Sequence, residues 1–287
     1  MAGQFTPWRD HAGRISPLKL ATFVILLLPG LWLLLRILGH DLGGRPITEL
    51  THRTGDWTVR FLLATLAVTP LRAVLDWPRL VLLRRMLGVG TACYAAIHVM
   101  LYVVDQKFAL GVVVSEIARR FYLTIGFLAF LGLLTLAITS TDGWQKRLRQ
   151  RWKKLHRLVF VIAGLGLLHY FIQTKLDVTD AVFAAGIFAW LGLWRLAPKR
   201  WQGRLALVAA LAVLAPVATA LTEGAWYALA TGVRASRVLA ANLDLGADRP
   251  SAEILLWAAV LLLVAALRRW RRWPLWRRAR RDGTLPA

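Results

Sequence analysis

Acidic residues are scarce in this 287-residue chain. Asp and Glu number 15 against 37 Lys and Arg, so the formal net charge is +22, although charged residues make up only 18% of the total. A basic balance would suit a nucleic-acid-binding protein, but 57% apolar residues and runs of about twenty nearly uncharged residues exclude a soluble one. The apolar content also excludes a disordered basic tail. The composition therefore predicts a polytopic membrane protein that does not bind nucleic acid.

Cysteine is nearly absent too. The single Cys93 lies inside an apolar run, so no intrachain disulfide can form and cysteine says nothing about the redox compartment of the loops. On an ideal helix Cys93 faces away from His98, five residues later. No small-residue cleavage site follows the first apolar run, so we do not expect a cleavable signal peptide.

Eight apolar runs are long enough to cross a bilayer, because about 20 helical residues at about 1.5 Å each cover roughly 30 Å. They lie approximately at 18–38, 59–76, 86–104, 121–140, 156–174, 179–197, 204–223 and 252–268. Thr69-Pro70 and Arg72 interrupt the second run, so a kinked or partly interfacial helix is an alternative there. The predicted fold class is an all-α, polytopic integral membrane bundle of about eight transmembrane helices.

The segments between the runs form two alternating sets of different charge. The N-terminus, the tail from Arg268 and residues 72–85, 142–157 and 195–204 hold 26 Lys and Arg against 4 acids, whereas the other set holds 11 of each. Short cytoplasmic loops carry the excess of basic residues, so both termini are predicted to be cytoplasmic. Seven spans would break this alternation. The outer loops, predicted at 39–57, 105–120 and 224–251, would be nearly neutral.

Two of the six histidines stand out by their depth. His98 lies 14 residues beyond Arg84 and His169 lies 13 beyond His156, about 20 Å along each axis. Their spans are two apart in the chain, so they enter the membrane from the same side. An ionisable side chain at such depth is a functional-site hypothesis. The other interpretation of each is a hydrogen-bonded core residue that ties helices together. The remaining histidines outside the predicted spans, which we expect to be ordinary loop residues, are His11, His40 and His52.

Two imidazoles at one depth on facing helices can supply both axial nitrogens of a haem iron, while the apolar bundle buries the macrocycle. No nearby cluster of carboxylates or thiolates suggests zinc instead. We therefore predict that His98 and His169 are the axial ligands of one haem b.

His156 does not fit the same pair. It lies roughly 140° around an ideal helix from His169, and the matching point of the third span carries Arg84-Arg85. A second haem, a contact to a haem propionate and a quinone site all remain open for it. The basic run at 146–157 fits topology and anionic lipid, and could also offer counter-charge to a flavin phosphate or a propionate. Because Gly88-Val89-Gly90 does not open a dinucleotide-binding fold, electrons must come from a membrane carrier or another protein.

Several short strings, in order along about residues 20–198, resemble the MsrQ (YedZ) family of haem-binding membrane subunits. They are AVTPLR at 67–72, RRMLG at 84–88, YAAIH at 94–98 with Tyr102, EIARRFYLTIG at 116–126, AITS at 137–140, WKKLHRLV at 152–159, and His169-Tyr170 followed by Lys175. The family usually has Arg-Pro-Tyr where this chain has Arg120-Phe121-Tyr122. From about Lys199 onward nothing resembles a known family.

The resemblance implies a ferric-reductase-like transmembrane domain with His98, His156 and His169 as haem-associated residues, and also FMN. It further implies electron transfer from the quinone pool to a periplasmic molybdopterin-containing methionine-sulfoxide reductase, in the bacterial inner membrane. On this basis the expected regions are a cytoplasmic N-terminus (1–17), a six-helix haem-binding domain (18–198) and an extension with two spans and an Arg-rich cytoplasmic tail (199–287).

Two other functions compete with this one. A transporter whose histidines relay protons would need polar residues along a path through several spans, or an inverted repeat, and neither is visible. A stand-alone ferric or metal reductase would deliver electrons directly to an external ion and would not need the partner.

Overall fold

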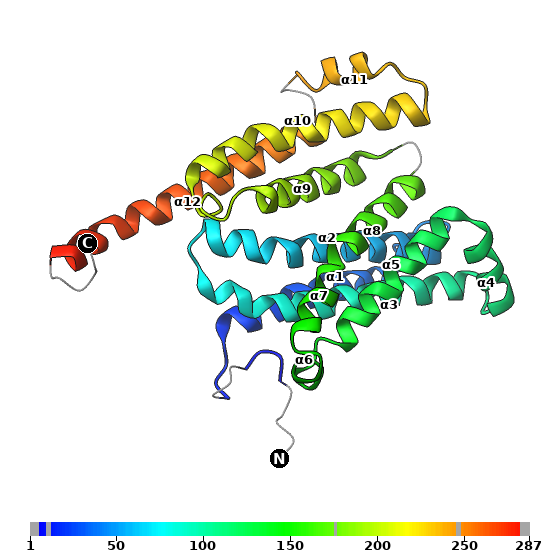
Figure 1. The fold of residues 1–287 in the computed structure, drawn as a ribbon. Helices are drawn as coiled ribbons and strands as arrows, with labels where there is room; N and C mark the ends of the chain where they lie inside the picture. The colour runs from blue at the N-terminus through cyan, green and yellow to red at the C-terminus, as the bar shows by residue number, and fades with distance from the viewer. Residues whose placement is uncertain (1–5, 10–12, 175–176, 245–247, 282–287) are drawn as a thin grey trace. The chain divides into compact units, whose positions relative to one another are not determined.

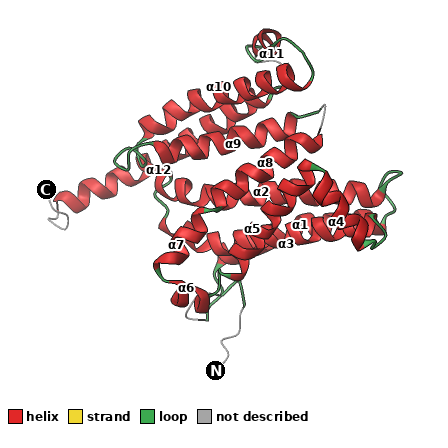
Figure 2. Cartoon of the chain, turned by 45° about the vertical axis from the view of Figure 1, so that its right-hand side comes forward, coloured by secondary structure: helices red, strands yellow, loops and turns green. Residues whose placement is uncertain are grey.

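The computed structural model describes residues 6–9, 13–174, 177–244 and 248–281, with side chains described as far as Arg271. Within these residues the only β pairing is one bridge between Arg9 and Ile15. Figures 1 and 2 show the helices, which are α1 (Pro17–Leu38), α2 (Pro46–Val74), the 3-10 helix η1 (Pro78–Leu83), α3 (Arg84–Asp105), α4 (Leu110–Arg119), α5 (Phe121–Ile138), α6 (Asp142–Leu148), α7 (Gln150–Arg157), α8 (Val159–Thr174), α9 (Thr179–Leu196), α10 (Leu205–Ala230), α11 (Ala235–Ala241) and α12 (Pro250–Arg281).

Eight stretches of the described chain are helical, long and apolar enough to cross a membrane. This confirms the predicted all-α polytopic fold, and each stretch overlaps one predicted span. The eight are Pro17–Leu38, Pro46–Val74, Pro78–Asp105, Phe121–Ile138, Gln150–Thr174, Thr179–Leu196, Leu205–Ala230 and Pro250–Arg271.

The second span begins earlier than predicted. α2 starts at Pro46, so residues 46–58 are helical rather than part of an outer loop, and α2 continues through Pro70. Its first turns contain Thr51, Thr54 and Thr58, whose hydroxyls donate to the carbonyls of Ile47, Leu50 and Thr54 at 2.8 Å each. A threonine bonded in this way hides its polar group within its own helix. Hydropathy counts these residues as polar, which is why the sequence placed the start of the span too late.

Short helices also occupy segments predicted to lie between spans. Residues 105–120 contain α4, residues 142–157 contain α6 and α7, and residues 224–251 contain the end of α10 and α11. The prediction of eight spans is unaffected, because α4, α6 and α11 are too short to cross a bilayer.

Contacts divide the chain into two compact units. The first comprises residues 1–68 and 81–175, and the second comprises residues 69–80 and 176–287. In the first unit α5 packs against both α3 and α8, and α1 packs against α3. Figure 1 shows α2, α3, α5 and α8 side by side, and α4 crossing the end of this group where α3 finishes. We call this the Asp105 end of the first unit, and the opposite end, where α3 begins, the Arg84 end.

A tyrosine joins α1 to α3. Pro29 lies inside α1. Next to it, at Gly30, the Tyr94 hydroxyl lies between a backbone N–H and a backbone carbonyl of α1. It accepts from the Gly30 backbone N–H at 2.9 Å and donates to the Leu26 carbonyl at 2.8 Å. These are the two groups that an uninterrupted helix would pair with each other, so the hydroxyl takes the place of one backbone hydrogen bond. Tyr94 lies one turn before His98 and fixes α1 beside that part of α3.

The second unit is built on close packing of α9, α10 and α12, with one buried polar cluster. Glu223 of α10 is only 3% exposed. Its carboxylate pairs with Arg249 at 2.9 Å and accepts a hydrogen bond from Asn242 at 2.8 Å. Asn242 in turn accepts from Ser251 at 2.6 Å. The cluster therefore ties the segment around α11 to α10 and to the start of α12.

Candidate functional site

His98 is held by α2. Its ring nitrogen Nδ1 lies 2.7 Å from the Thr51 carbonyl oxygen. Because a carbonyl only accepts, Nδ1 must carry the proton, and Nε2 is left with its lone pair free to bind a metal. One turn further along α2, a Cβ atom on Gly55 would lie 3.1 Å from the His98 ring, so the imidazole packs directly on bare backbone.

His169 is held by α5 in the same way. Its Nδ1 donates to the Tyr122 carbonyl at 2.8 Å, and the Tyr122 ring stacks on the imidazole with centroids 6.2 Å apart. A Cβ atom on Gly126 would lie 2.7 Å from His169 Nδ1. His169 therefore also has Nε2 free.

The two glycines explain why the carbonyls are within reach. In an α-helix the carbonyl of residue i points along the axis toward residue i+4, whose side chain would normally crowd a third group. Gly55 follows Thr51 by four residues, and Gly126 follows Tyr122 by four. Each carbonyl has a second lone pair for the imidazole, and the missing Cβ leaves room for it.

The two histidine rings are neighbours in an edge-on arrangement. Their centroids are 6.3 Å apart, and their planes are inclined by 82°. Because a metal–imidazole bond is about 2 Å long and a ring centre lies about 1 Å behind its nitrogen, two imidazoles on opposite sides of one metal have centroids roughly 6 Å apart. The observed separation fits one iron between the rings. The interplanar angle of 82° is compatible with this, because the planes of two imidazoles that bind one metal can take any angle to each other.

Two nitrogens are enough for a haem iron, because the macrocycle supplies the other four ligands. Within the described residues no three His, Cys, Asp or Glu side chains gather around a point that could hold a bare ion. The residues present therefore fit a haem, with His98 and His169 as the groups that could ligate it.

The halves of the site repeat one spacing. Thr51 and His98 are 47 residues apart, and so are Tyr122 and His169. In each half, one helix begins at the Asp105 end and carries the carbonyl and the glycine; these helices are α2 and α5. The next long helix, α3 or α8, runs back to the Asp105 end and carries the histidine. The pair is thus built from two equivalent hairpins, α2–α3 and α5–α8.

His156 lies in α7, near the Arg84 end, in a different setting. Its Nε2 is 3.3 Å from the Ser140 hydroxyl, and its Nδ1 donates to the Trp152 carbonyl at 3.2 Å. Its ring stacks on the Trp152 indole, with centroids 3.9 Å apart. Both nitrogens therefore already have protein partners, so His156 is not arranged like His98 or His169.

Of the histidines predicted to be loop residues, His40 lies in a turn after α1 and His11 lies outside the described residues. The prediction was wrong for His52, which is in α2 because that helix begins at Pro46. His52 follows Thr51, and its Nε2 is 3.4 Å from Gln173 Nε2, one turn beyond His169. It therefore links the two hairpins at the edge of the site.

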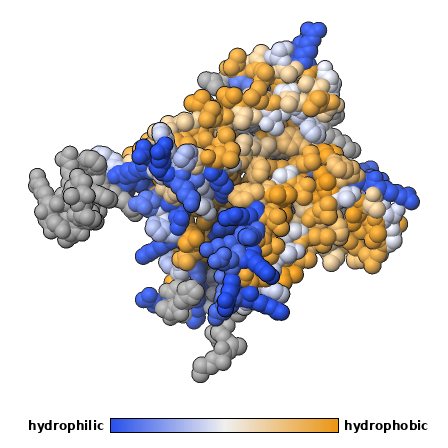
Figure 3. Space-filling view, viewed as in Figure 1, coloured by the Kyte–Doolittle hydropathy of each residue, from blue (hydrophilic) through white to orange (hydrophobic). Residues whose placement is uncertain are grey.

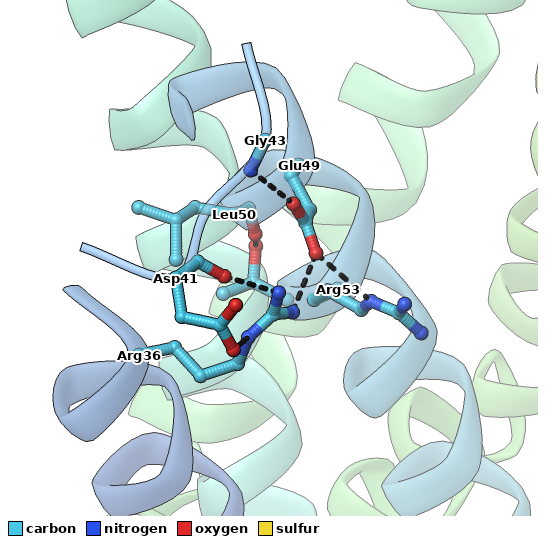
Figure 4. A network of polar contacts seen from close by, with 7 residues as sticks. Arg36, Asp41, Gly43, Glu49, Leu50 and Arg53 are labelled. Atoms are coloured by element: carbon cyan, nitrogen blue, oxygen red, sulfur yellow. Dashed lines mark hydrogen bonds and ion pairs between the residues drawn. The ribbon is translucent and has the colours of Figure 1, made fainter. Parts of the chain in front are cut away.

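A polar network closes the α1–α2 turn next to this edge (Figure 4). Arg36 donates to Glu49 at 2.6 Å and to the side chain and carbonyl of Asp41. Glu49 also accepts from the Gly43 backbone at 3.3 Å and lies 3.9 Å from Arg53. These charges balance one another. An open hollow of about 410 Å³ adjoins the network, lined by Gly43, Arg45, Thr48, Glu49, His52, Arg53 and Asp56.

Arg120 stands between α4 and α5 and begins the turn that carries Tyr122. Its guanidinium pairs with Glu116 and lies 3.5 Å from the Tyr122 hydroxyl. These contacts, first the Tyr122 hydroxyl and then the Glu116 carboxylate, raise the pKa of Arg120 above its usual value. Arg120 therefore stays a cation at any physiological pH.

The sequence predicted the two facing histidines but not the residues that hold them, which are Thr51, Gly55, Tyr122 and Gly126. A signal was present, since a glycine lies 43 residues before each histidine. It has meaning only once the helices are paired, because the hydrogen bonds go to backbone atoms. Lys175, part of the family resemblance, lies outside the described residues.

Comparison with known proteins defines the class first. Residues 54–167, which include Gly55, Gly126, His98 and His156 and end two residues before His169, match the family model described as ferric reductase like transmembrane component. Together with the eight apolar helices, this makes the protein a polytopic helical membrane protein with a ferric-reductase-like component. No solved structure gives a significant match.

Curated relatives then define the family. A protein of Rhodospirillum rubrum is 42% identical over 201 residues, which cover 68% of this chain and 94% of the relative. A protein of Xanthomonas campestris is 44% identical over 160 residues (55% and 73%), and one of Caulobacter vibrioides is 39% identical over 178 residues (61% and 83%). Each is named protein-methionine-sulfoxide reductase heme-binding subunit MsrQ. The chain belongs to the MsrQ family.

Proposed function

We propose that this protein is a b-type haem electron-transfer subunit of a methionine-sulfoxide reductase system. The observation that carries the proposal is the pair His98 and His169, with ring centroids 6.3 Å apart and both Nδ1 atoms bonded to backbone carbonyls. Relatives covered over most of their length are named heme-binding subunits of this kind. A haem bound between the two rings would supply one-electron chemistry inside the bilayer.

The chain's own residues would position the ligands. The carbonyls of Thr51 and Tyr122 fix the tautomer and the orientation of each imidazole. An imidazole that donates its second N–H in this way is a stronger ligand, and its ring cannot turn away from the metal. The apolar faces of α2, α3, α5 and α8 would exclude water from the macrocycle.

The direction of electron transfer follows from the proposed sidedness. The basic segments, with 26 of the 37 Lys and Arg, would be cytoplasmic, so both termini would be in the cytoplasm of a bacterial cell with the protein in its inner membrane. The Asp105 end, where His98 and His169 lie, would then face the periplasm. There a molybdopterin-containing partner would receive electrons for methionine-sulfoxide reduction. Membrane quinol would be the donor.

Several finer points are proposals of the same kind. The region around His156, with its stacked indole and the basic run at 146–157, is where a second haem, a haem propionate or a quinone would bind. FMN is expected from the family resemblance alone, and no step above depends on it. The proposed haem site lies wholly in the first compact unit, whereas a six-helix domain extending to residue 198 stays a prediction.

Spectroscopy on the purified protein tests this function. From haem-replete cells, the wild type should show a Soret band that a quinol analogue reduces, and a pyridine haemochrome assay should give at least one haem per chain. His98→Ala and His169→Ala should each lose the bis-imidazole signals in the electron paramagnetic resonance spectrum. His40→Asn is the matched control, because His40 lies in a turn with φ of 51°, which Asn tolerates. A folded wild type without haem absorbance would refute the proposal.

A stand-alone metal reductase is the second candidate, favoured by the match to the ferric-reductase-like family model. Reduction of ferric citrate by quinol-loaded membranes separates the two functions. An electron-transfer subunit should reduce the iron slowly and methionine sulfoxide rapidly once the partner is added. A metal reductase should reduce the iron at full rate without the partner.

A further inference from the structure

α4 carries exposed apolar side chains that no other described element covers. Leu110 and Val114 are 64% and 66% exposed, and they lie four residues apart on one flank with Ala118. Before the helix Phe108 is 63% exposed, and after it Phe121 is 66% exposed. We call Leu110, Val114 and Ala118 the α4 stripe.

Three sides of α4 differ in chemistry. Val113 is buried, and α4 packs against α5 on that side. About 100° around the helix in one direction lies the α4 stripe, and about 100° in the other lie Glu116, Arg119 and Val112. A helix with protein on one side, an apolar flank and a charged flank has the pattern of a segment lying in a membrane interface.

The place of α4 in the chain sets its depth. It lies between two spans, with only residues 106–109 before it and Arg120 after it, so both of its ends are held where spans leave the hydrocarbon. Lys107 and Phe108, with φ of 53° and 58°, turn the chain from α3 into α4. Figure 1 shows α4 running across the end of the bundle rather than along it.

The corner into α5 fixes the direction of the stripe. The Thr124 hydroxyl donates to the Ile117 carbonyl at 2.5 Å, and Arg120 pairs with Glu116. The apolar flank therefore cannot rotate freely about the helix axis. On α5, Phe121 and Leu128 lie two turns apart and are 66% and 52% exposed, so apolar side chains are exposed on both helices at this corner. In Figure 3 the apolar surface extends from the flank of α3 and α5 toward the end where α4 lies.

We propose that α4 is an interfacial helix whose stripe is inserted among the phospholipids of the leaflet at the Asp105 end. The α4 stripe would contact lipid acyl chains rather than another protein, and the opposite flank would face water. α4 would thus anchor the turn from which Tyr122 holds His169, independently of any partner.

The single cysteine makes the test direct. In a Cys93→Ser background, Val112→Cys and Val114→Cys place the same new side chain on opposite flanks of one helix. Nanodiscs of phosphatidylethanolamine and phosphatidylglycerol, loaded with one chain each, would be treated with a charged maleimide. A thiol among acyl chains is protonated and inaccessible to this reagent, so Val114→Cys should react at least about tenfold more slowly than Val112→Cys.

Controls make each outcome decisive. In SDS both variants should react at equal rates, and an unchanged haem spectrum would show that each is folded. Equal rates in nanodiscs would mean that the stripe faces water, which would overturn the proposal. So would a slow Val114→Cys reaction only after the reductase partner is added, because the stripe would then be a protein-docking surface.

Discussion

At the scale of single residues, two missing side chains shape the histidine pair. Gly55 and Gly126 let the rings of His98 and His169 reach backbone carbonyls that a side chain would cover. Gly164 and Gly166 lie in the same span as His169, yet a Cβ atom on either would meet nothing within 4 Å. Glycines in these helices are therefore not equivalent, and only the first two belong to the site.

Gly126→Ala should weaken haem binding strongly. The new methyl group would lie 2.7 Å from His169 Nδ1 and would push the ring off the Tyr122 carbonyl. Loss of such a partner typically weakens metal affinity by about 10- to 100-fold. Haem retained per chain after dilution in detergent measures the effect. Gly55→Ala, with a contact of 3.1 Å, should have a smaller effect.

Gly164→Ala is the matched control, because it makes the same change on the helix of His169 but about 140° around that helix from the imidazole, and it should leave haem content at the wild-type level. Equal haem loss in Gly126→Ala and Gly164→Ala would contradict the role assigned to Gly126.

What sequence could predict at this scale was set by side-chain chemistry. An imidazole in an apolar span is costly and is visible in the sequence, so His98 and His169 could be singled out as candidates, and the structure brings them together. Their partners are carbonyl oxygens of Thr51 and Tyr122, which every residue type possesses. Only the paired helices show which carbonyl is used.

At the scale of elements, hydropathy located eight helices but misjudged how α2 begins. The threonine hydroxyls there bond to carbonyls one turn earlier, so residues that score as polar present little unsatisfied polarity. Thr54 is only 2% exposed as a result. The sequence did not predict α4 either. Its ten residues are too few to cross a bilayer, so a search for spans does not detect it.

Glu223 offers a test at the scale of elements. Glu223→Leu should destabilise the second unit by about 1–3 kcal/mol, because the half-buried Arg249 would lose its partner and Asn242 would lose its acceptor. Trypsin should then cleave more rapidly at Arg234, Arg237 or Arg249, around α11. The double variant Glu223→Leu with Arg249→Met should recover part of the stability, since no unpaired charge remains.

Haem absorbance should stay unchanged in both variants at low temperature, because the cluster lies in the second unit. Protease resistance equal to that of the wild type in Glu223→Leu would show that the cluster does not hold α11 in place.

At the scale of the whole molecule, charge rather than packing predicts sidedness. Figure 3 shows hydrophilic residues gathered over α6 and α7, at the Arg84 end of the first unit. This is where the basic run at 146–157 lies. Hydropathy fixes how many times the chain crosses, and the asymmetry of Lys and Arg then selects one of two orientations.

Reporter fusions check the orientation. Green fluorescent protein fused after Ala287 should fluoresce, and alkaline phosphatase at the same place should be inactive, because the C-terminus is predicted to be cytoplasmic. Alkaline phosphatase inserted after Gly111 should be active in the periplasm. The reverse pattern would place the His98–His169 pair toward the cytoplasm and would exclude a periplasmic partner as the direct electron acceptor.

The equal spacing of 47 residues in the two hairpins bears on ancestry. A homodimer of one hairpin, with a single histidine, carbonyl and glycine per copy, would present the same two rings across its symmetry axis. Duplication and fusion of such a hairpin would yield the order seen here, and each copy could then change alone. Thr51 is at the position equivalent to Tyr122, and Arg85 is at the position equivalent to His156. In that history these two pairs would mark where the copies diverged, one pair at the Asp105 end and one at the Arg84 end.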